Sequence, residues 1–306
     1  MIVTQARKPH KIRSSMADRL FAGINNTFLG VFTLLVLYPL VYVVSCSFSS
    51  AESLVAGQVF LFPVSFSLQG YKAVLDNPQV WSGYANSVLY TVSGTIIGVV
   101  ATIIGSFVLS RGEFPLRPVL TVMFMITMFF NGGLLPTYIL IRNLGLYNTI
   151  WSIILPGSFS VWLAIIGRTF IKTSIPEELY EATSLDGGCY AQYFLRILLP
   201  LSKPILAVFA LNFAVGHWNS YFSALIYLKD SGKFPLQIIL RNIVIANQFD
   251  VNAISKSDAK TMMEKAYLGE LLKYSLIIVS SVPLLIVYPF IQKYFIKGVM
   301  IGSIKG

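Results

Sequence analysis

The chain has 306 residues, of which 55% are hydrophobic and 12% charged, and its mean hydropathy is +0.71. Soluble domains carry about 25% charged residues, so the composition favours a polytopic membrane protein over a soluble domain. The formal net charge of +10 would also suit a nucleic-acid-binding protein. However, the sequence has no basic patch interspersed with aromatic residues outside the apolar windows. We therefore expect no nucleic-acid partner.

Long windows without a charged residue predict the membrane spans. A bilayer core of about 30 Å needs roughly 20 apolar residues of helix, and lipid admits only helices or closed barrels. We therefore predict an all-α, polytopic integral membrane protein with a cytoplasmic N-terminal segment over residues 1–21 and one transmembrane domain over residues 22–306. The six predicted transmembrane helices lie near residues 22–46, 87–109, 119–141, 150–169, 204–226 and 273–292.

Basic residues predict the orientation of these helices, because cytoplasmic loops favour Lys and Arg. Five of them precede the first span: Arg7, Lys8, Lys11, Arg13 and Arg19. We expect both termini in the cytoplasm. The apolar run that follows is too long for the core of a signal peptide. In this topology Cys46 and Cys189 lie on opposite sides of the membrane, so we expect neither a disulfide nor a metal site.

Two long outer loops are expected, over residues 47–86 and 229–272, and residues 142–148 are expected to form a short outer connection. Residues 53–71 lack charge, but Pro63 and several polar residues make this window a poor span. The second loop has balanced charge. It is expected either to meet a binding protein or a partner permease, or to be a solvated connection.

The long inner loop over residues 168–203 contains a coupling segment, residues 174–200, that is predicted to form two short helices separated by a turn. Ser174 and Glu177 have the spacing of a capping box, and Pro176 suits a first helical turn. The glycine pair that begins at Gly187 would end the first helix, because glycine reaches positive φ without a Cβ penalty. Such a helix-turn-helix before the fifth span could transmit force from a soluble partner. An amphipathic loop resting on lipid headgroups is the alternative.

The same stretch, EATSLDGGCYAQYFLRILLP, resembles the EAA motif of permease subunits from ATP-binding-cassette (ABC) importers. That motif reads E-A-A, three residues, G, nine residues and I-x-L-P. The matching residues here are Glu181, Ala182, Gly187, Ile197, Leu199 and Pro200. Thr183 stands in place of the second alanine and is still a small residue.

Two further stretches extend the resemblance to nearly the whole chain, from about residue 15 onward. NGGLLPTYILIRNLGLYNTIWSIILPG and NFAVGHWNSYFSALIYL are similar to the carbohydrate-uptake, maltose-type branch of these permeases. Within that branch they are similar to the lipoprotein-named and alginate-type permeases for oligosaccharides. The resemblance implies a bacterial plasma-membrane subunit that imports carbohydrate. It also implies a second homologous permease, two cytoplasmic ATP-binding subunits and an extracytoplasmic solute-binding protein.

No phosphate loop of the form G-x-x-x-x-G-K-[ST] is present in the sequence. The Gly-Lys pair at Gly232 lacks the upstream glycine and is followed by Phe234. We therefore expect a transport subunit that is not an enzyme, has no ATPase site of its own and binds no cofactor. ATP and Mg would be used by the partner ATPase subunits.

By resemblance, the helix-turn-helix is the ATPase-docking element. Glu181 would pair with a cation on the ATPase, Ala182 would permit close approach and Gly187 would set the turn. The alternative for Glu181 is stabilisation of the helix dipole. The docking candidates are Tyr180, Glu181, Ala182, Thr183, Leu185, Asp186, Gly187, Ile197 and Pro200.

Polar residues in the predicted fifth span mark a candidate path for the sugar. Polar side chains in a span usually face a bundle interior or a watery cavity. Sugar binding favours an aromatic ring with amide hydrogen bonds, which Trp218 and Asn219 could supply. Interhelical hydrogen bonding is the alternative. The path candidates are Asn131, Asn212, Gly216, His217, Trp218, Asn219 and Tyr221.

Two other functions are alternatives to the ATP-driven importer. A secondary transporter driven by an ion gradient would need acidic or histidine relays within its spans, but the predicted spans contain no Asp or Glu and only His217. An intramembrane enzyme would need paired carboxylates, a His-rich metal sequence or a base beside a serine. The sequence offers none of these patterns at membrane depth.

Overall fold

The computed structural model describes residues 15–249 and 259–303, and every regular element in those ranges is helical. This confirms the predicted all-α class. Three single helices are each long and apolar enough for a span: α1 (Met16–Ser47), α4 (Pro78–Ser110) and, in its Ala266–Pro289 stretch, α15 (Ala259–Ser303). Two further pairs of helices are each bent at a short break. Each pair is long and apolar enough for a span only when its two helices are counted together.

The described ranges thus hold three candidate spans, or up to five if each bent pair is one span. The predicted number of six is not confirmed by this count, and the predicted orientation stays a prediction. Residues 1–14 of the predicted N-terminal segment lie outside the described residues.

The predicted third span, 119–141, is wrong as one continuous helix. It is divided between α5 (Arg117–Phe129) and α6 (Leu134–Asn143), which meet at 116°. Asn131 lies in the break, where its Oδ1 accepts a hydrogen bond from the N–H of Gly133 at 2.8 Å. Such a local bond from side chain to backbone competes with the helical pattern, so the chain turns here.

The predicted fourth span, 150–169, is also interrupted. Its residues belong to α7 (Trp151–Ile154) and α8 (Val161–Ser174). Pro156 follows α7 closely, and proline disfavours the helical conformation in the residue before it and lacks an N–H for the helix. The second helix continues to Ser174, beyond the predicted end.

The predicted fifth span, 204–226, ends early. Its main part is α12 (Lys203–Trp218), and α13 (Tyr221–Tyr227) follows as a separate helix. The side-chain amide of Asn219 donates to the carbonyl of Val215 at 3.0 Å. The backbone N–H of Asn219 donates to the same carbonyl at 3.1 Å, and Asn219 is the C-cap residue at which α12 ends.

The two predicted outer loops contain short helices. The first holds α2 (Ala51–Val55) and α3 (Gln69–Leu75), and it agrees with the prediction that residues 53–71 do not form a span. The second holds η2 (Ser231–Lys233) and α14 (Leu236–Phe249). Because the first turns of α14 are buried at Leu236, Ile238, Ile239 and Leu240, a fully solvated loop is wrong for this segment.

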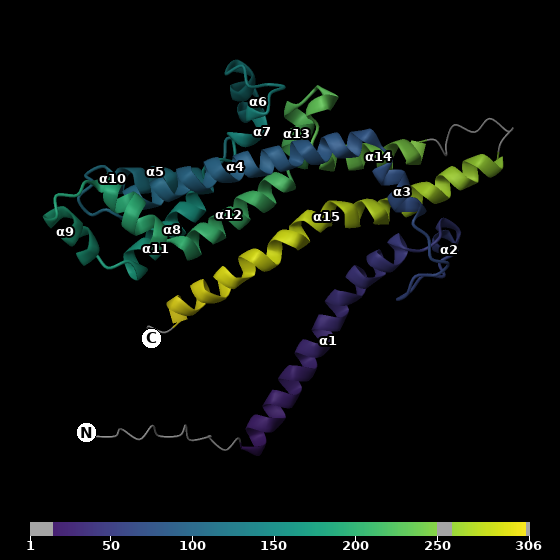
Figure 1. Ribbon diagram of the computed structural model, residues 1–306, viewed down its shortest axis with the longest axis horizontal. Helices are drawn as coiled ribbons and strands as arrows, with labels where there is room; N and C mark the ends of the chain where they lie inside the picture. The colour runs from purple at the N-terminus through teal and green to yellow at the C-terminus, as the bar shows by residue number, and fades with distance from the viewer. Residues whose placement is uncertain (1–14, 250–258, 304–306) are drawn as a thin grey trace.

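Helix α4 is the central element of the bundle. It packs against α12, α8 and α14, and α15 packs against α12, α14 and α3. In Figure 1, the short helices that follow α8 lie at one end of the bundle, and α2, α3 and α14 lie toward the other end. Helix α1 runs at an angle to the rest, and its side chains from Met16 to Leu40 are exposed.

A close approach between α4 and α12 depends on Gly94. A Cβ atom at this position would lie 2.4 Å from Nε2 of His217, which is closer than van der Waals contact allows. The imidazole of His217 is itself buried, with 6% of the residue exposed. Glycine at position 94 therefore lets the two helices pack at a distance that other residues would prevent.

Candidate functional site

The predicted coupling loop forms a helix-turn-helix, but its start differs from the prediction. Its first helix is α9 (Glu178–Leu185), and Glu177 occupies the N-cap position without a side-chain capping bond. Ser174 is the last residue of α8 rather than a cap of α9. The predicted capping box is therefore wrong, because α8 extends through Ser174 and leaves only a short connection at Pro176.

The predicted turn at Gly187 is confirmed. Gly187 has a φ of +74°, a left-handed conformation that costs residues with a Cβ atom about 1 kcal/mol or more. Its N–H donates to the carbonyl of Ser184 at 3.1 Å, and the N–H of Gly188 donates to the carbonyl of Thr183 at 2.8 Å. This bonding pattern is a Schellman motif, which ends α9 and fixes the direction of the next helix.

The second helix runs from Tyr190 to Leu201 and is then bent by 80° against α12. It begins with a side-chain bond, in which Oε1 of Gln192 accepts from the N–H of Cys189 at 3.1 Å. It consists of α10 (Tyr190–Tyr193), a π-helical turn η1 (Phe194–Leu198) and α11 (Leu199–Leu201). Pro200 lies in the first turn of α11.

The docking candidates divide between an outward face and an inward face. Glu181, Ala182, Asp186 and Gly187 are exposed, and Leu185 is 89% exposed. Tyr180 and Ile197 are half-buried and pack against a core cluster formed by α4, α8 and α12 together with α10 and η1. Thr183 is half-buried and its hydroxyl donates to the carbonyl of Leu179 at 2.7 Å, whereas Pro200 is exposed. The motif thus presents small, acidic and apolar groups on one surface at the end of the bundle.

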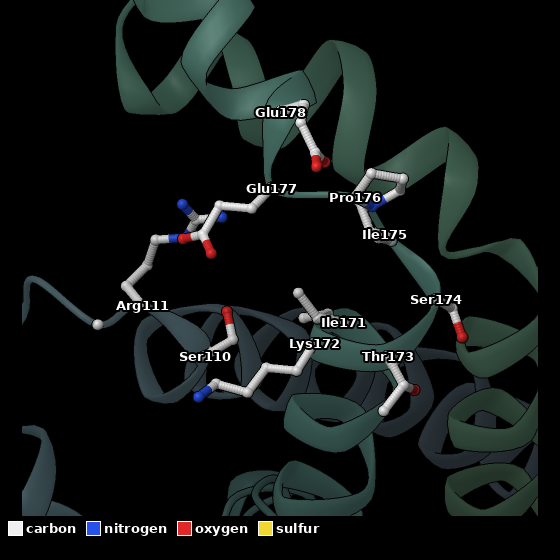
Figure 2. A pocket seen from close by; sticks show the side chains of 11 residues that line it. Ser110, Arg111, Ile171, Lys172, Thr173, Ser174, Ile175, Pro176, Glu177 and Glu178 are labelled. Atoms are coloured by element: carbon white, nitrogen blue, oxygen red, sulfur yellow. The ribbon is translucent and has the colours of Figure 1, made fainter.

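A cleft of about 660 Å³ lies beneath the connection from α8 to α9. Figure 2 shows side chains from the end of α4, the end of α8 and the start of α9 around it. Desolvation and the guanidinium groups of Arg117 and Arg168 lower the pKa of Lys172, which lines this cleft, while Glu177 acts in the opposite direction. The cleft separates α9 from the ends of α4 and α8 on this side.

The path candidates on α12 also divide into two groups. Asn212, Gly216 and Asn219 are exposed and recur at helical spacing, and a Cβ atom at Gly216 would meet nothing within 4 Å. His217 lies on the packed side against Gly94. These three exposed positions therefore form an open face of α12, which we call the α12 polar face.

Trp218 belongs to the packed group. It is 3% exposed, and its indole Nε1–H donates to the carbonyl of Ser280 in α15 at 3.0 Å. Tyr221 is half-buried, with the guanidinium carbon of Arg241 5.8 Å from its ring centroid. Asn131 is exposed in the α5–α6 break and bonds within its own turn. The structure therefore groups only some of the seven candidates on one face.

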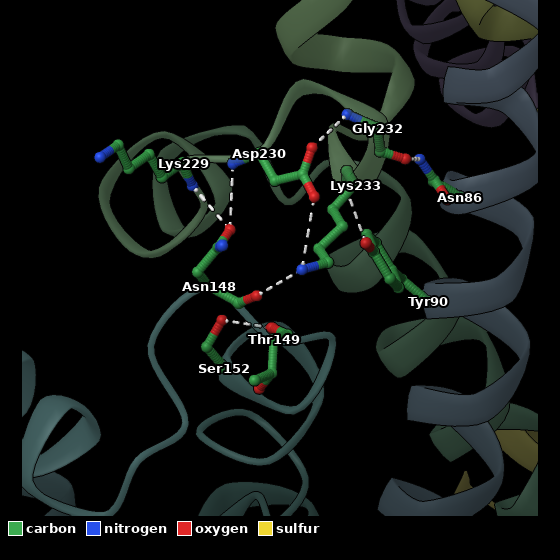
Figure 3. A network of polar contacts seen from close by, with 9 residues as sticks. All are labelled: Asn86, Tyr90, Asn148, Thr149, Ser152, Lys229, Asp230, Gly232 and Lys233. Carbon is green, nitrogen blue, oxygen red and sulfur yellow. Dashed lines mark hydrogen bonds and ion pairs between the residues drawn. The ribbon is translucent and has the colours of Figure 1, made fainter.

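A polar network joins the 142–148 connection to the start of the 229–272 loop, two segments that are predicted to lie outside (Figure 3). The Oδ1 of Asn148 accepts from the N–H groups of Lys229 and Asp230, each at 3.0 Å. The carbonyl of Asn148 accepts from Nζ of Lys233 at 3.0 Å, and the Tyr90 hydroxyl donates to the carbonyl of Lys233 at 2.7 Å. These bonds attach both loops to α4 and hold them as one unit.

Sequence reasoning missed Arg111, which caps the C-terminus of α4 and is 9% exposed. It lies in the short connection between α4 and α5. The sequence does show that Arg111 is a cation directly after a predicted span and that Phe107 lies one helical turn before it. It also shows that the coupling loop is rich in tyrosine. Only the fold brings those rings to the guanidinium.

Comparisons with known proteins agree along nearly the whole chain. A family model described as the binding-protein-dependent transport system inner membrane component matches residues 11–301. Protein LplC of Bacillus subtilis (strain 168) is 36% identical over 297 residues, covering 97% of this chain and 99% of LplC. The polygalacturonan/rhamnogalacturonan transport system permease protein YtcP of the same organism is 35% identical over 291 residues, covering 95% of this chain and 100% of YtcP.

A solved structure has the same fold. It is described as the crystal structure of a bacterial ABC transporter involved in the import of the acidic polysaccharide alginate. One of its chains matches with a TM-score of 0.82 and 32% identity, over 93% of this chain and 100% of that chain. These matches confirm the resemblance to ABC importer permeases and a location in the bacterial inner membrane. The chain belongs to the family of binding-protein-dependent transport system inner membrane components.

Proposed function

We propose that this permease subunit imports oligosaccharides released from acidic polysaccharides. The observation that carries the proposal is the full-length similarity to two proteins whose names specify such polymers, the polygalacturonan/rhamnogalacturonan permease and the alginate transporter. The family assignment also decides between the two transport mechanisms weighed from the sequence, because it favours an ABC permease over an ion-gradient-driven transporter.

The transport unit in this proposal has several chains. A second homologous permease completes the path, two cytoplasmic ATP-binding subunits hydrolyse ATP with Mg, and an extracytoplasmic solute-binding protein delivers the sugar. This chain binds no cofactor itself and has no catalytic role. Six spans with both termini in the cytoplasm would place α9 on the ATPase side.

The outward surface of α9 is proposed as the ATPase-docking surface. Glu181, Ala182 and Leu185 are exposed on a helix whose end is fixed by the turn at Gly187. Their exposure at the end of the bundle supports a contact with a soluble protein rather than a role in the core. Glu181 also lies in the first turn of α9, where it would stabilise the helix dipole.

The α12 polar face is proposed to line the sugar path. Amide side chains at Asn212 and Asn219 offer hydrogen-bond donors and acceptors for hydroxyl groups, and Gly216 leaves room between them. A polar face directed at lipid would be costly, which supports a location toward a water-filled cavity or a partner permease. His217 and Trp218 contribute by packing α12 against α4 and α15.

Uptake by the complete transporter in proteoliposomes tests this function. The permease pair and the ATPase subunits are reconstituted, and the binding protein is added outside with labelled oligogalacturonate or oligoalginate. We expect uptake that requires ATP inside the vesicles and is insensitive to ionophores. Uptake without ATP would contradict the proposed mechanism, and uptake restricted to neutral oligosaccharides would contradict the proposed substrate class.

A further inference from the structure

Helix α9 is attached to the rest of the protein by few side chains. None of its own residues is buried, and the cleft of about 660 Å³ opens beneath its connection to α8. Tyr180 is the α9 side chain that packs against the core cluster of α4, α8 and α12. A force on the outward surface of α9 must therefore reach the bundle largely through Tyr180 or through the covalent connections.

Arg111 holds Tyr180 from the other side. Its guanidinium carbon lies 4.4 Å from the ring centroid of Tyr180, 5.3 Å from that of Tyr193 and 5.5 Å from that of Phe107. All three distances lie within the range in which a cation is attracted to an aromatic face. The three rings come from α9, α10 and α4, so one side chain joins three helices.

The rings also contact one another. The Tyr180 ring meets that of Tyr193 in a T-shaped arrangement with centroids 5.4 Å apart, and it stacks on Tyr190 at 5.1 Å. Phe107 lies 6.2 Å from Tyr193. We call Arg111 with Phe107, Tyr180, Tyr190 and Tyr193 the Arg111 cluster.

Within residues 15–249 and 259–303, no ion pair joins Arg111 to a carboxylate. Glu177 lines the same cleft (Figure 2), but the two residues do not form an ion pair. Among the described residues, the buried Nε and Nη1 atoms of Arg111 have no hydrogen-bond partner. A buried cation is costly unless other interactions compensate it. The aromatic side chains are therefore its principal partners: their rings surround the guanidinium, and the Tyr193 hydroxyl also shares a hydrogen bond with it. A planar guanidinium suits such a site better than an ammonium group.

We propose that Arg111 is a positioning residue that couples α9 to α4 and so transmits the movement of the docking helix to the transport path. The route continues because α4 packs along α12, where Gly94 contacts His217. His217 adjoins Gly216 of the α12 polar face in the sequence. This inference rests on the proposed docking role of α9, but the attachment itself can be tested without the ATPase.

The first test measures the attachment in the isolated full-length chain. Cys189 is exposed beside the Arg111 cluster, whereas Cys46 is buried, so a nitroxide attached to Cys189 in nanodiscs reports on the α9–α10 turn. We expect Arg111→Met to make the label more mobile and Arg111→Lys to have a smaller effect, because lysine keeps the charge. Arg196→Gln is the matched control, since it removes an exposed cation of η1 outside the cluster. Equal mobility in the Met variant and the wild type would overturn the proposal.

The second test measures coupling in the complete transporter. Loss of a desolvated cation–aromatic contact corresponds to roughly a tenfold change in an equilibrium constant. We expect Arg111→Met to lower the sugar imported per ATP hydrolysed by about tenfold, with the ATPase still retained on purification. Arg196→Gln removes a cation outside the cluster and should keep the coupling.

The outcomes of the second test separate the two proposals. An unchanged ratio of uptake to hydrolysis in Arg111→Met would overturn the role of Arg111 while leaving the docking role of α9 intact. Loss of the ATPase from this variant would also overturn it, because Arg111 would then act in docking or folding. A wild-type chain that retains no ATPase would instead contradict the proposed function, and the spin-label result would stand independently.

Discussion

Gly94 is a residue at which the packing of α4 against α12 tolerates little change. His217 fills the space that a Cβ atom would need, and its burial gives the imidazole little freedom to withdraw. Gly216, one residue before His217 on α12, has open space instead. A methyl group should therefore fit at Gly216 but not at Gly94, although both residues lie in helices of the same bundle.

We expect Gly94→Ala to destabilise the permease by about 1–3 kcal/mol, the usual cost of overpacking. Gly216→Ala is the matched control and should be neutral or slightly stabilising, because glycine in a helix costs about 0.5–1 kcal/mol relative to alanine. Thermal unfolding of both variants in detergent measures the difference. A Gly94→Ala variant with the melting temperature of the wild type would show that α4 and α12 are not held at this distance.

Asn219 and Trp218 are adjacent in the sequence but face different surroundings. Asn219→Ala should raise the KM of uptake, because it removes an amide from the α12 polar face. Trp218→Phe should lower stability by about 0.6 kcal/mol through the lost hydrogen bond to Ser280 and leave the KM unchanged. Uptake kinetics and thermal unfolding on the same preparations measure both effects. A raised KM in Trp218→Phe alone would reverse these roles.

The sequence predicted which residues of α12 are polar but not which way they point. Asn212 and Asn219 are exposed, whereas His217 and Trp218 are buried. Helical spacing places residues on faces, yet only the positions of α4 and α15 decide which face is packed. The turn at Gly187 was predictable because its bonds are local. The contacts of Arg111 were not, because they join residues about 70 positions apart in the chain.

Helix α9 combines local and tertiary determinants. Its two first-turn carboxylates, Glu178 and Glu181, are both exposed, and both are stabilised by the positive end of the helix dipole. Only Glu181 belongs to the motif that is proposed to dock the ATPase. The pair therefore separates a docking role from the stabilisation of the helix.

We expect Glu181→Lys to lose the ATPase on purification, because it would place a cation against the cation proposed on the partner. Glu178→Lys removes a similar dipole interaction, worth about 0.3–1 kcal/mol, and should retain the ATPase. Co-purification through a tag on the permease measures retention, and gel filtration confirms that both variants are folded. If both variants lose the ATPase equally, the loss reflects helix stability and Glu181 has no specific docking role.

At the scale of single helices, hydropathy predicted where the apolar helices lie but not where they are interrupted. Windows without charge identified α1, α4 and the apolar part of α15 correctly. They failed where a polar side chain or a proline ends a helix inside an apolar window, as at Asn131, Pro156 and Asn219. A window average counts such a residue as one position, whereas the backbone responds to its specific hydrogen bond or missing N–H.

At the scale of the whole molecule, the coupling proposal and the path proposal depend on one orientation. Helix α9 lies at one end of the bundle, and the loops joined through Asn148 are attached to α4 nearer its other end. The basic residues before α1 predict that the α9 end is cytoplasmic. If this is correct, ATP-driven movement at α9 reaches the α12 polar face along α4 without passing through the outer loops.

Labelling with a membrane-impermeant maleimide tests this orientation. Cys189 is exposed and Cys46 is buried, so the wild-type chain should react at Cys189 in inside-out vesicles stripped of ATPase and remain unlabelled in spheroplasts. Ser231 is exposed in η2, and a Ser231→Cys variant in a Cys189→Ser background should show the reverse pattern. This matched variant shows that the reagent reaches the outer surface. Labelling of Cys189 from outside would place α9 away from any cytoplasmic ATPase, and neither docking at Glu181 nor coupling through Arg111 could then operate.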